Sequence, residues 1–194
     1  MSKSDPSRSK KERNKTIRWV VTIFMVTIFV TALITLISDE IMSSSGIVMS
    51  FVILLLIVII GIVFDIIGVA VTSADESPFH SMAARKVPGA QEAIRLLRNA
   101  ERVSSICNDV VGDICGVVSG TASAAIALQV LQNFEFTWPR IVSLSMSAFV
   151  SGLTVGGKAI GKTFAVNSST GIVHFAGEVI ATLTGRRISS KSKK

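Results

Sequence analysis

One stretch of the chain limits its fold more than any other, because residues 47–71 are almost entirely apolar. No charged residue occurs between Phe51 and Phe64, and the first charge is Asp65. A helix needs about 20 apolar residues to cross the roughly 30 Å hydrocarbon layer of a bilayer. An α-helix also satisfies all its backbone hydrogen bonds within one segment, as that layer requires. The stretch therefore predicts a transmembrane helix over residues 47–72.

The composition of the whole chain agrees with a membrane protein. Of 194 residues, 49% are hydrophobic and only 17% are charged, and tyrosine is absent. Such a composition is unusual for a water-soluble domain of this length. We predict an all-α integral membrane protein and exclude a soluble enzyme and a nucleic-acid-binding domain.

Three further apolar runs predict spans at residues 17–37, 103–131 and 138–160. The first run is longer than the core of a signal peptide, and Ser38, Asp39 and Glu40 follow it in place of a small-residue cleavage pattern. We interpret it as a retained helix. The chain then has about four transmembrane helices, with residues 47–183 forming one transmembrane domain.

Two segments have amphipathic patterns. In residues 79–102, apolar side chains recur at helical spacing opposite polar ones: Ala90, Ala93, Ile94 and Leu97 against Gln91, Glu92, Arg95 and Arg98. This pattern predicts a helix at the membrane surface or on a partner. Residues 163–183 are moderately apolar but include His174 and Glu178. We expect an interfacial helix there, with a fifth span as the alternative.

The basic residues indicate the orientation of the chain. Lys and Arg gather in residues 1–18, 85–102 and 186–194 and are absent from the turns at 38–46 and 132–137. With four spans, all three basic segments lie on one side, which the positive-inside rule assigns to the cytoplasm. We expect a plasma-membrane protein with both termini cytoplasmic, a disordered basic tail at 1–16 and a second basic tail at 184–194. Because the basic residues gather in the predicted cytoplasmic segments, the net charge of +7 does not indicate binding to nucleic acid.

Three acidic residues within the apolar zone are candidate functional groups, because a carboxylate there is costly unless it is paired or hydrated. They are Asp65, Asp109 and Asp113. The last two are four residues apart, on one helix face, and Asn108 adjoins them. Carboxylate and amide oxygens suit a hard cation such as Mg²⁺. The alternative is that these acids lie near helix ends, facing water or basic groups.

Small residues form a stripe in the same segment. Gly112, Gly116 and Gly120 follow at four-residue spacing, which lets helix backbones approach closely. The spacing leaves open whether the packing joins helices of one chain or of two.

Two carboxylates on neighbouring helices also allow comparison with intramembrane aspartyl proteases, which use two acids sharing a proton. Here these would be Asp65 and Asp113. Val110 stands where such enzymes have a glycine, and the chain has too few spans to enclose a peptide.

Three motifs resemble those of a known transporter family. Residues 65–73 read DIIGVAVTS, residues 107–112 read CNDVVG, and residues 157–165 read GKAIGKTFA. Their order is similar to the S-G-S-E-x-A-x-x-S, G-N-N-x-x-N and G-E-x-x-P-K-x-x-A motifs in the transmembrane domain of the cyclin-M and CorC/CorB magnesium transporters. The resemblance covers nearly half of the chain. It implies a homodimer in the lipid bilayer and a Mg²⁺ site that includes Ser73, Asn108 and Asp109.

The leading hypothesis is therefore a membrane protein that binds and transports a divalent cation, Mg²⁺ or else Co²⁺. Its expected site residues are Asp65, Ser73, Asn108, Asp109 and Asp113, and we expect no enzymatic activity. Three positions depart from the family motifs: Gly68 and Lys158 replace acidic residues, and Gly161 replaces a proline. The family's cytoplasmic CBS and CorC-type domains are also missing, so a separate cytoplasmic protein is expected to supply that role. The alternative is a membrane partner or regulatory subunit that kept the fold without the ion path.

Overall fold

The computed structural model of the chain describes residues 6–134 and 138–184. Within them every regular element is a helix, which confirms the all-α prediction. In chain order the helices are α1 (Pro6–Ser44), α2 (Ile47–Ser73), α3 (Ser77–Ala84), α4 (Ala90–Arg98), α5 (Ala100–Ser105), the π-helix η1 (Ile106–Gly112), α6 (Asp113–Asn133), α7 (Pro139–Asn167) and α8 (Ser169–Leu183).

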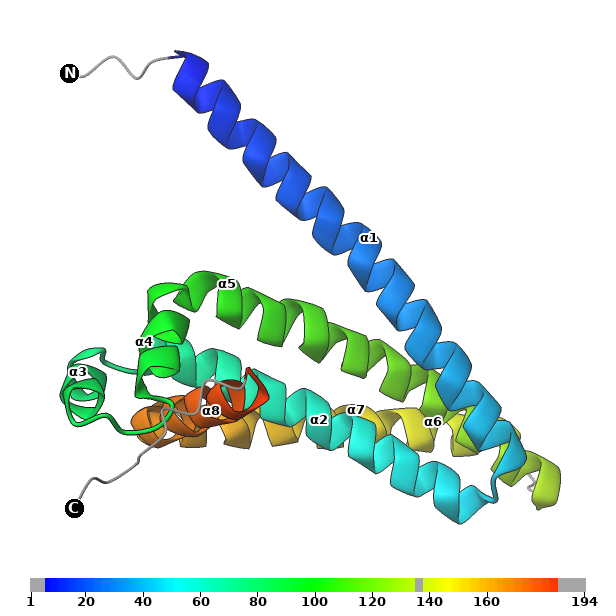
Figure 1. Cartoon of the computed structure of the whole chain (residues 1–194). Helices are drawn as coiled ribbons and strands as arrows, with labels where there is room; N and C mark the ends of the chain where they lie inside the picture. The colour runs from blue at the N-terminus through cyan, green and yellow to red at the C-terminus, as the bar shows by residue number, and fades with distance from the viewer. Residues whose placement is uncertain (1–5, 135–137, 185–194) are drawn as a thin grey trace.

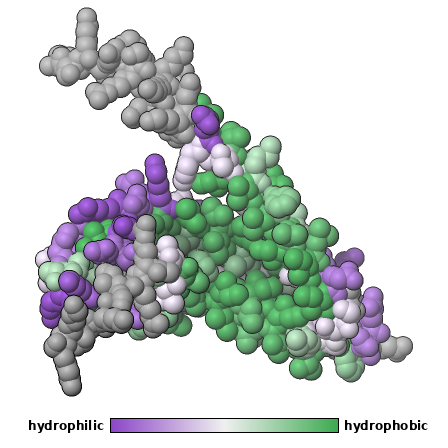
Figure 2. Space-filling view, in the orientation of Figure 1, coloured by the Kyte–Doolittle hydropathy of each residue, from purple (hydrophilic) through white to green (hydrophobic). Residues whose placement is uncertain are grey.

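Four of the described helices are long and apolar enough to cross a membrane. They are residues Ile17–Met42 of α1, the whole of α2, the continuous α5, η1 and α6 segment (Ala100–Asn133), and α7. Figure 2 shows an apolar belt over the middle of the molecule, with polar residues gathered at both ends. This distribution is typical of a membrane-embedded bundle.

Helix α2 packs against both α6 and α7, which also pack against each other (Figure 1). Its inward side chains Leu54 and Val58 pack against Ala122 and Ile126 of α6 and Val150 of α7. Leu54 and Val58 are four residues apart, so they lie on one face of α2 and meet both neighbours. Small residues on α6 and α7 keep these helices close to α2.

Helix α1 packs against α6 and α2 near its C-terminal end and diverges from the bundle towards its N-terminus (Figure 1). The side-chain amide Nε2 of Gln129 donates a hydrogen bond to the Met42 carbonyl oxygen at 2.8 Å and so fixes this end of α1 to α6. The most apolar 18-residue window of α1 buries none of its residues. In the membrane that surface faces lipid or another protein.

The structure extends α1 to Pro6, into the segment expected to be a disordered tail. Lys, Arg and Glu have high helix propensities, and proline is favoured at the first helical position, so the apolar span continues as a helix. Residues 1–5 of that tail, and 185–194 of the C-terminal tail, lie outside the described residues.

The segment 79–102 is not the single amphipathic helix that we expected. Helices α3 and α4 and the first turn of α5 share it, with a turn between α3 and α4 at residues 85–89. Two residues of this turn have positive φ, Lys86 (58°) and Gly89 (79°), and Pro88 lies between them. A proline and left-handed residues interrupt helical hydrogen bonding, so the helix ends and restarts.

Helices α3, α4 and α8 form a layer over one end of the bundle (Figure 1). Phe79 of α3, Ala93 of α4 and Val173 of α8 are fully buried together against the end of α2. Gly89 and Gly177 permit the approach of α4 to α8, because a Cβ on Gly177 would lie 2.5 Å from the Gly89 carbonyl oxygen. The amphipathic face of α4 thus covers other helices of the chain.

The fourth span is longer than predicted, because α7 continues to Asn167. Helix α8 covers most of the segment expected to be interfacial, and its 15 residues do not qualify it as a span. It packs against α4 and α2 at the same end as α3.

Candidate polar centre of the transmembrane bundle

Asp65 is buried within the transmembrane helices, with only 4% of its surface exposed. It shares one face of α2 with Gly61 and Gly68, and all three residues are buried. The spacing of four and then three residues keeps them on one side of the helix, towards α6, η1 and α7. The two glycines leave room for the neighbouring helices, so the carboxylate is enclosed by protein.

Lys158 of α7 faces this carboxylate. Its Nζ lies 3.8 Å from Asp65 Oδ1, and 23% of its side chain is exposed against 6% for Asp65. The ammonium lies over Gly112, where a Cβ would be 3.3 Å from Nζ. Opposite charges at this distance offset part of the cost of burying each one. The other carboxylate oxygen, Oδ2, is buried without a hydrogen-bond partner among the described residues.

Asn108 of η1 is a second polar group at this centre. Its side chain packs directly against Gly68, where any Cβ would collide with the amide. The amide Nδ2 donates to Ser104 Oγ at 3.3 Å. The amide oxygen Oδ1 is buried and, within the described part of the chain, has no partner. Gly68 lies three residues after Asp65 on the same face of α2, so the two buried oxygens without a partner belong to the same region of the bundle.

Asn108 lies in a π-helix, and its amide faces inwards while its acidic neighbours are exposed. A π-helix has more residues per turn than an α-helix, so it changes which side chains share a face, and such segments are frequent at functional sites. In η1, Cys107 and Gly112 are buried, whereas Asp109 is exposed. The sequence pattern carries no recognisable signal for this change of register.

The three acids do not form one cluster. Asp109 accepts a hydrogen bond from Ser105 Oγ at 2.8 Å on its own helix, and both Asp109 and Asp113 are exposed. Among the described residues no three His, Cys, Asp or Glu side chains gather closely enough to hold a metal ion. The expectation of a shared carboxylate pocket is therefore wrong for the single chain. Asp65 pairs with Lys158 and not with Asp113, so the aspartyl-protease geometry is not formed either.

Ser73 ends α2 and is exposed, eight residues beyond Asp65. At 1.5 Å per residue this spacing corresponds to about 12 Å along the helix. Asp65 and the Gly68 position that Asn108 covers thus share the buried face of α2, whereas Ser73, Asp109 and Asp113 lie on the outside. Lys158 joins the centre although it was not among the predicted site residues. A lysine within an apolar span was the available signal, because such a charge needs a partner.

The glycine stripe of α6 divides into a covered and an open part. Gly112 lies beneath Lys158, whereas a Cβ on Gly116 or Gly120 would meet no atom within 4 Å. Gly152 and Gly156 of α7 are open in the same way. The predicted role of Gly112, Gly116 and Gly120 in close packing therefore applies within the chain only to Gly112.

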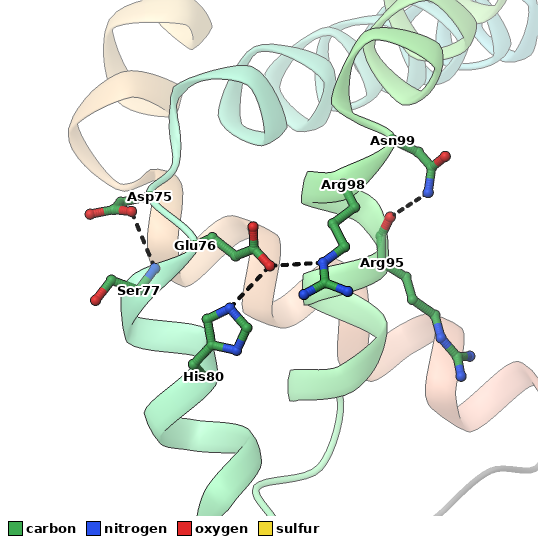
Figure 3. Close-up of polar contacts among 7 residues, drawn as sticks. All are labelled: Asp75, Glu76, Ser77, His80, Arg95, Arg98 and Asn99. Atoms are coloured by element: carbon green, nitrogen blue, oxygen red, sulfur yellow. Dashed lines mark hydrogen bonds and ion pairs between the residues drawn. The ribbon is translucent and has the colours of Figure 1, made fainter.

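A separate polar network connects the layer at the end of the bundle (Figure 3). Glu76 Oε1, just before α3, accepts from Arg98 Nε of α4 at 2.9 Å and lies 3.1 Å from His80 Nε2. Nearby, the backbone N–H of Ser77 donates to Asp75 Oδ1 at 3.2 Å. These groups are largely exposed, so the network orients α3 and α4 and is distinct from the buried centre.

Comparisons with known proteins identify no relative of this chain: no protein-family model, no curated protein and no solved structure matches it. The resemblance to the cyclin-M and CorC/CorB family therefore stays a prediction from three short motifs. The case for a function depends on the geometry of Asp65, Asn108 and Lys158.

Proposed function

We propose that this protein binds a hard cation in a membrane and moves it across, with Mg²⁺ as the first candidate and Co²⁺ as the second. The observation that supports this is the pair of buried oxygens without partners, Asp65 Oδ2 and Asn108 Oδ1. A buried polar atom without a partner is costly and therefore rare in folded proteins. A bound cation removes that cost.

The chemistry of these two groups suits such an ion. Carboxylate and amide oxygens are ligands for hard cations, and Mg²⁺ commonly retains several waters beside one or two protein oxygens. Asp65 and Asn108 therefore supply enough protein ligands for a partly hydrated ion. Cys107 is buried nearby, but no Cys and His set with ligand spacing accompanies it among the described residues, so a soft-metal site has less support.

Lys158 makes binding at this centre conditional. Its ammonium offsets the charge of the Asp65 carboxylate, from whose other oxygen, Oδ1, it is 3.8 Å away. A cation approaching Asp65 is repelled until the ammonium moves, since like charges a few ångströms apart interact strongly in a poorly screened environment. We therefore propose that Lys158 occupies the centre when no ion is bound and swings towards its exposed side when one enters.

We propose that a cation reaches the centre past three exposed residues, Ser73, Asp109 and Asp113. Asp109 and Asp113 follow Asn108 and Gly112 directly and lie on the exposed side of the same helix. Negative charge beside a path raises the local cation concentration. The positive-inside rule orients this end, which also holds the basic segment 85–102, towards the cytoplasm of the cell. Both termini are then cytoplasmic.

A homodimer and a separate cytoplasmic regulator complete the proposal. The unburied surface of α1 supports the dimer, because a spanning helix with so little contact within its chain is available to a second copy. Light scattering of the purified protein in detergent tests it, and a strictly monomeric mass at all concentrations contradicts it.

The first experiment measures Mg²⁺ flux in liposomes containing the purified protein. We expect Asp65→Asn to lose most of the flux, because the neutral amide attracts the cation far less. The Asp109→Ala, Asp113→Ala double variant should retain a reduced flux. Asp75→Asn, an exposed acid outside the bundle, is the matched control and should behave as the wild type. Equal flux in wild type, Asp65→Asn and protein-free liposomes would refute transport.

The Asp65–Lys158 ion pair itself favours a second candidate function, a membrane partner or regulatory subunit without an ion path. A permanently paired carboxylate is a structural element and needs no ion. This candidate predicts no flux in the wild type and a folded protein that increases the transport by another membrane protein when the two are reconstituted together. A binding measurement separates the two, since only the transporter loses Mg²⁺ affinity in Asp65→Asn.

A further inference from the structure

A hydroxyl-lined groove lies between α6 and α7, apart from the residues already assigned to the centre. Its volume is about 240 Å³, and its lining is formed by small and hydroxyl-bearing residues: Gly116, Ser119, Gly120, Ser123, Ser147, Val150, Ser151, Thr154 and Val155. Hydroxyl groups are uncommon on helix surfaces that face lipid, because lipid offers them no hydrogen bonds. Five of the nine lining residues carry a hydroxyl, so a polar occupant would find hydrogen-bond partners there.

Ser123 gives independent evidence of such an occupant. Its side chain is 1% exposed, and its Oγ has no hydrogen-bond partner among the described residues. In helices, serine and threonine hydroxyls usually donate back to a carbonyl of the preceding turn. Ser119 and Thr154 in the same groove do so, at 3.0 Å and 2.8 Å. Ser123 departs from that pattern at the wall of the groove.

The groove leads to the polar centre. On α7, Ser147, Ser151, Thr154 and Lys158 follow at spacings of four, three and four residues, so they lie on one face. On α6, Gly112 lies one turn before Gly116, and the Lys158 ammonium lies over Gly112. The row of hydroxyls thus ends where Lys158 meets Asp65. Its far end, at Ser123 and Ser147, lies ten residues before the end of α6 and eight residues after the start of α7, on the side away from the layer of α3, α4 and α8 (Figure 1).

We propose that this groove is the second half of the cation path, joining the Asp65 centre to the side of the membrane opposite the α3, α4 and α8 layer. This inference rests on the proposed function. Serine and threonine oxygens replace part of the water around a passing ion, and Gly116 and Gly120 leave the width for the remaining water. Because the hydroxyls are neutral, the ion is held weakly there and moves on.

The test uses single cysteines in a variant whose two native cysteines are replaced by alanine, reconstituted in liposomes. Ser151→Cys in the groove is compared with Phe149→Cys, which lies on the same helix at a similar depth but is 65% exposed and outside the groove. A positively charged methanethiosulfonate reagent, which reacts only in water, should modify Ser151→Cys at least tenfold faster. Equal rates at the two positions would overturn the proposal. No reaction at Ser151→Cys would also overturn it, since the groove would then be closed to water, for example by a second copy of the chain.

A second variant links the groove to transport. Gly120→Leu fills the groove without touching Asp65, Asn108 or Lys158. We expect Mg²⁺ flux to fall at least fivefold while the Mg²⁺ affinity of the purified protein changes less than twofold. Unchanged flux in Gly120→Leu would overturn the path. If the proposed function itself is wrong, the wild type shows neither Mg²⁺ flux nor Mg²⁺ binding. The cysteine reactivity then still reports whether water enters the groove, so the two failures can be told apart.

Discussion

Two helix contacts of the same bundle use small residues in opposite ways. Where α2 meets η1 and α7, each glycine is covered: Gly68 by Asn108, Gly157 by Ile62 and Gly161 by Ile66. Along the outer face of α6 and α7, Gly116, Gly120, Gly152 and Gly156 face open space. Glycine thus permits close approach in the first region and leaves a hollow in the second, and the sequence spacing alone does not distinguish the two uses.

The largest expected effect comes from separating the ion pair in the covered region. Lys158→Met leaves the buried Asp65 carboxylate without its partner, and losing one member of a buried pair typically costs about 3–5 kcal/mol. Asp65→Leu should be comparably destabilising. The double variant should recover most of the loss, because neither charge then remains buried. Thermal unfolding in detergent, followed by a thiol-reactive dye on the buried Cys107, measures all three. Additive losses in the double variant would show that the two side chains do not interact.

The next effect is expected where α8 meets α4. Gly177→Ala places a methyl group 2.5 Å from the Gly89 carbonyl oxygen and 2.9 Å from the Ala93 backbone nitrogen. Backbone atoms yield little, so overpacking should cost about 1–3 kcal/mol. Gly171→Ala in the same helix meets no atom within 4 Å and is the matched control. The same unfolding assay compares them, and equal melting temperatures would contradict the close contact.

Gly68→Ala should act mainly on the polar centre. Its methyl group displaces the Asn108 amide, which is the end of a side chain and not backbone, so the expected destabilisation is at the low end, about 1 kcal/mol. If the amide oxygen is a ligand, Mg²⁺ affinity measured by isothermal titration should fall at least threefold. Unchanged affinity in a folded Gly68→Ala protein would remove Asn108 from the site.

The smallest effect is expected in the open region. Gly116→Ala adds a methyl group where nothing lies within 4 Å, and alanine favours a helix over glycine by about 1 kcal/mol. The variant should be as stable as the wild type or slightly more so, by unfolding temperature. A loss of more than a few degrees would mean that the position is filled in the assembled protein, and the contrast between the two regions would then fail.

Much of the architecture was predictable, because apolar length and turn residues decide where spans begin and end. The four spans follow from this signal, as does the break between α1 and α2 at Ser45 and Gly46. The boundaries that differ lie outside the apolar runs. There, helix propensity extends α1 to Pro6 and α7 to Asn167, while Pro88 and two positive-φ residues divide the segment 79–102.

The candidate site was only partly predictable. Asp65 was identified because a carboxylate at membrane depth is costly, and Asn108 because it adjoins Asp109 in one of the three motifs; each has a buried oxygen without a partner among the described residues. Asp109 and Asp113 were grouped with them because a spacing of four residues places both on one helix face, but both are exposed and so lie away from the buried Asp65. Lys158 was considered as a departure from a motif and not as the partner of Asp65.

By itself, the sequence determined that this chain is a four-span helical membrane protein, because hydrophobic length and hydrogen-bond demand depend on local composition. Only the tertiary structure decided which acid is buried, which lysine faces it and which glycines stay open. Those outcomes depend on how faces of helices distant in the chain meet, and a one-residue change of helical register, as in η1, redirects every side chain after it.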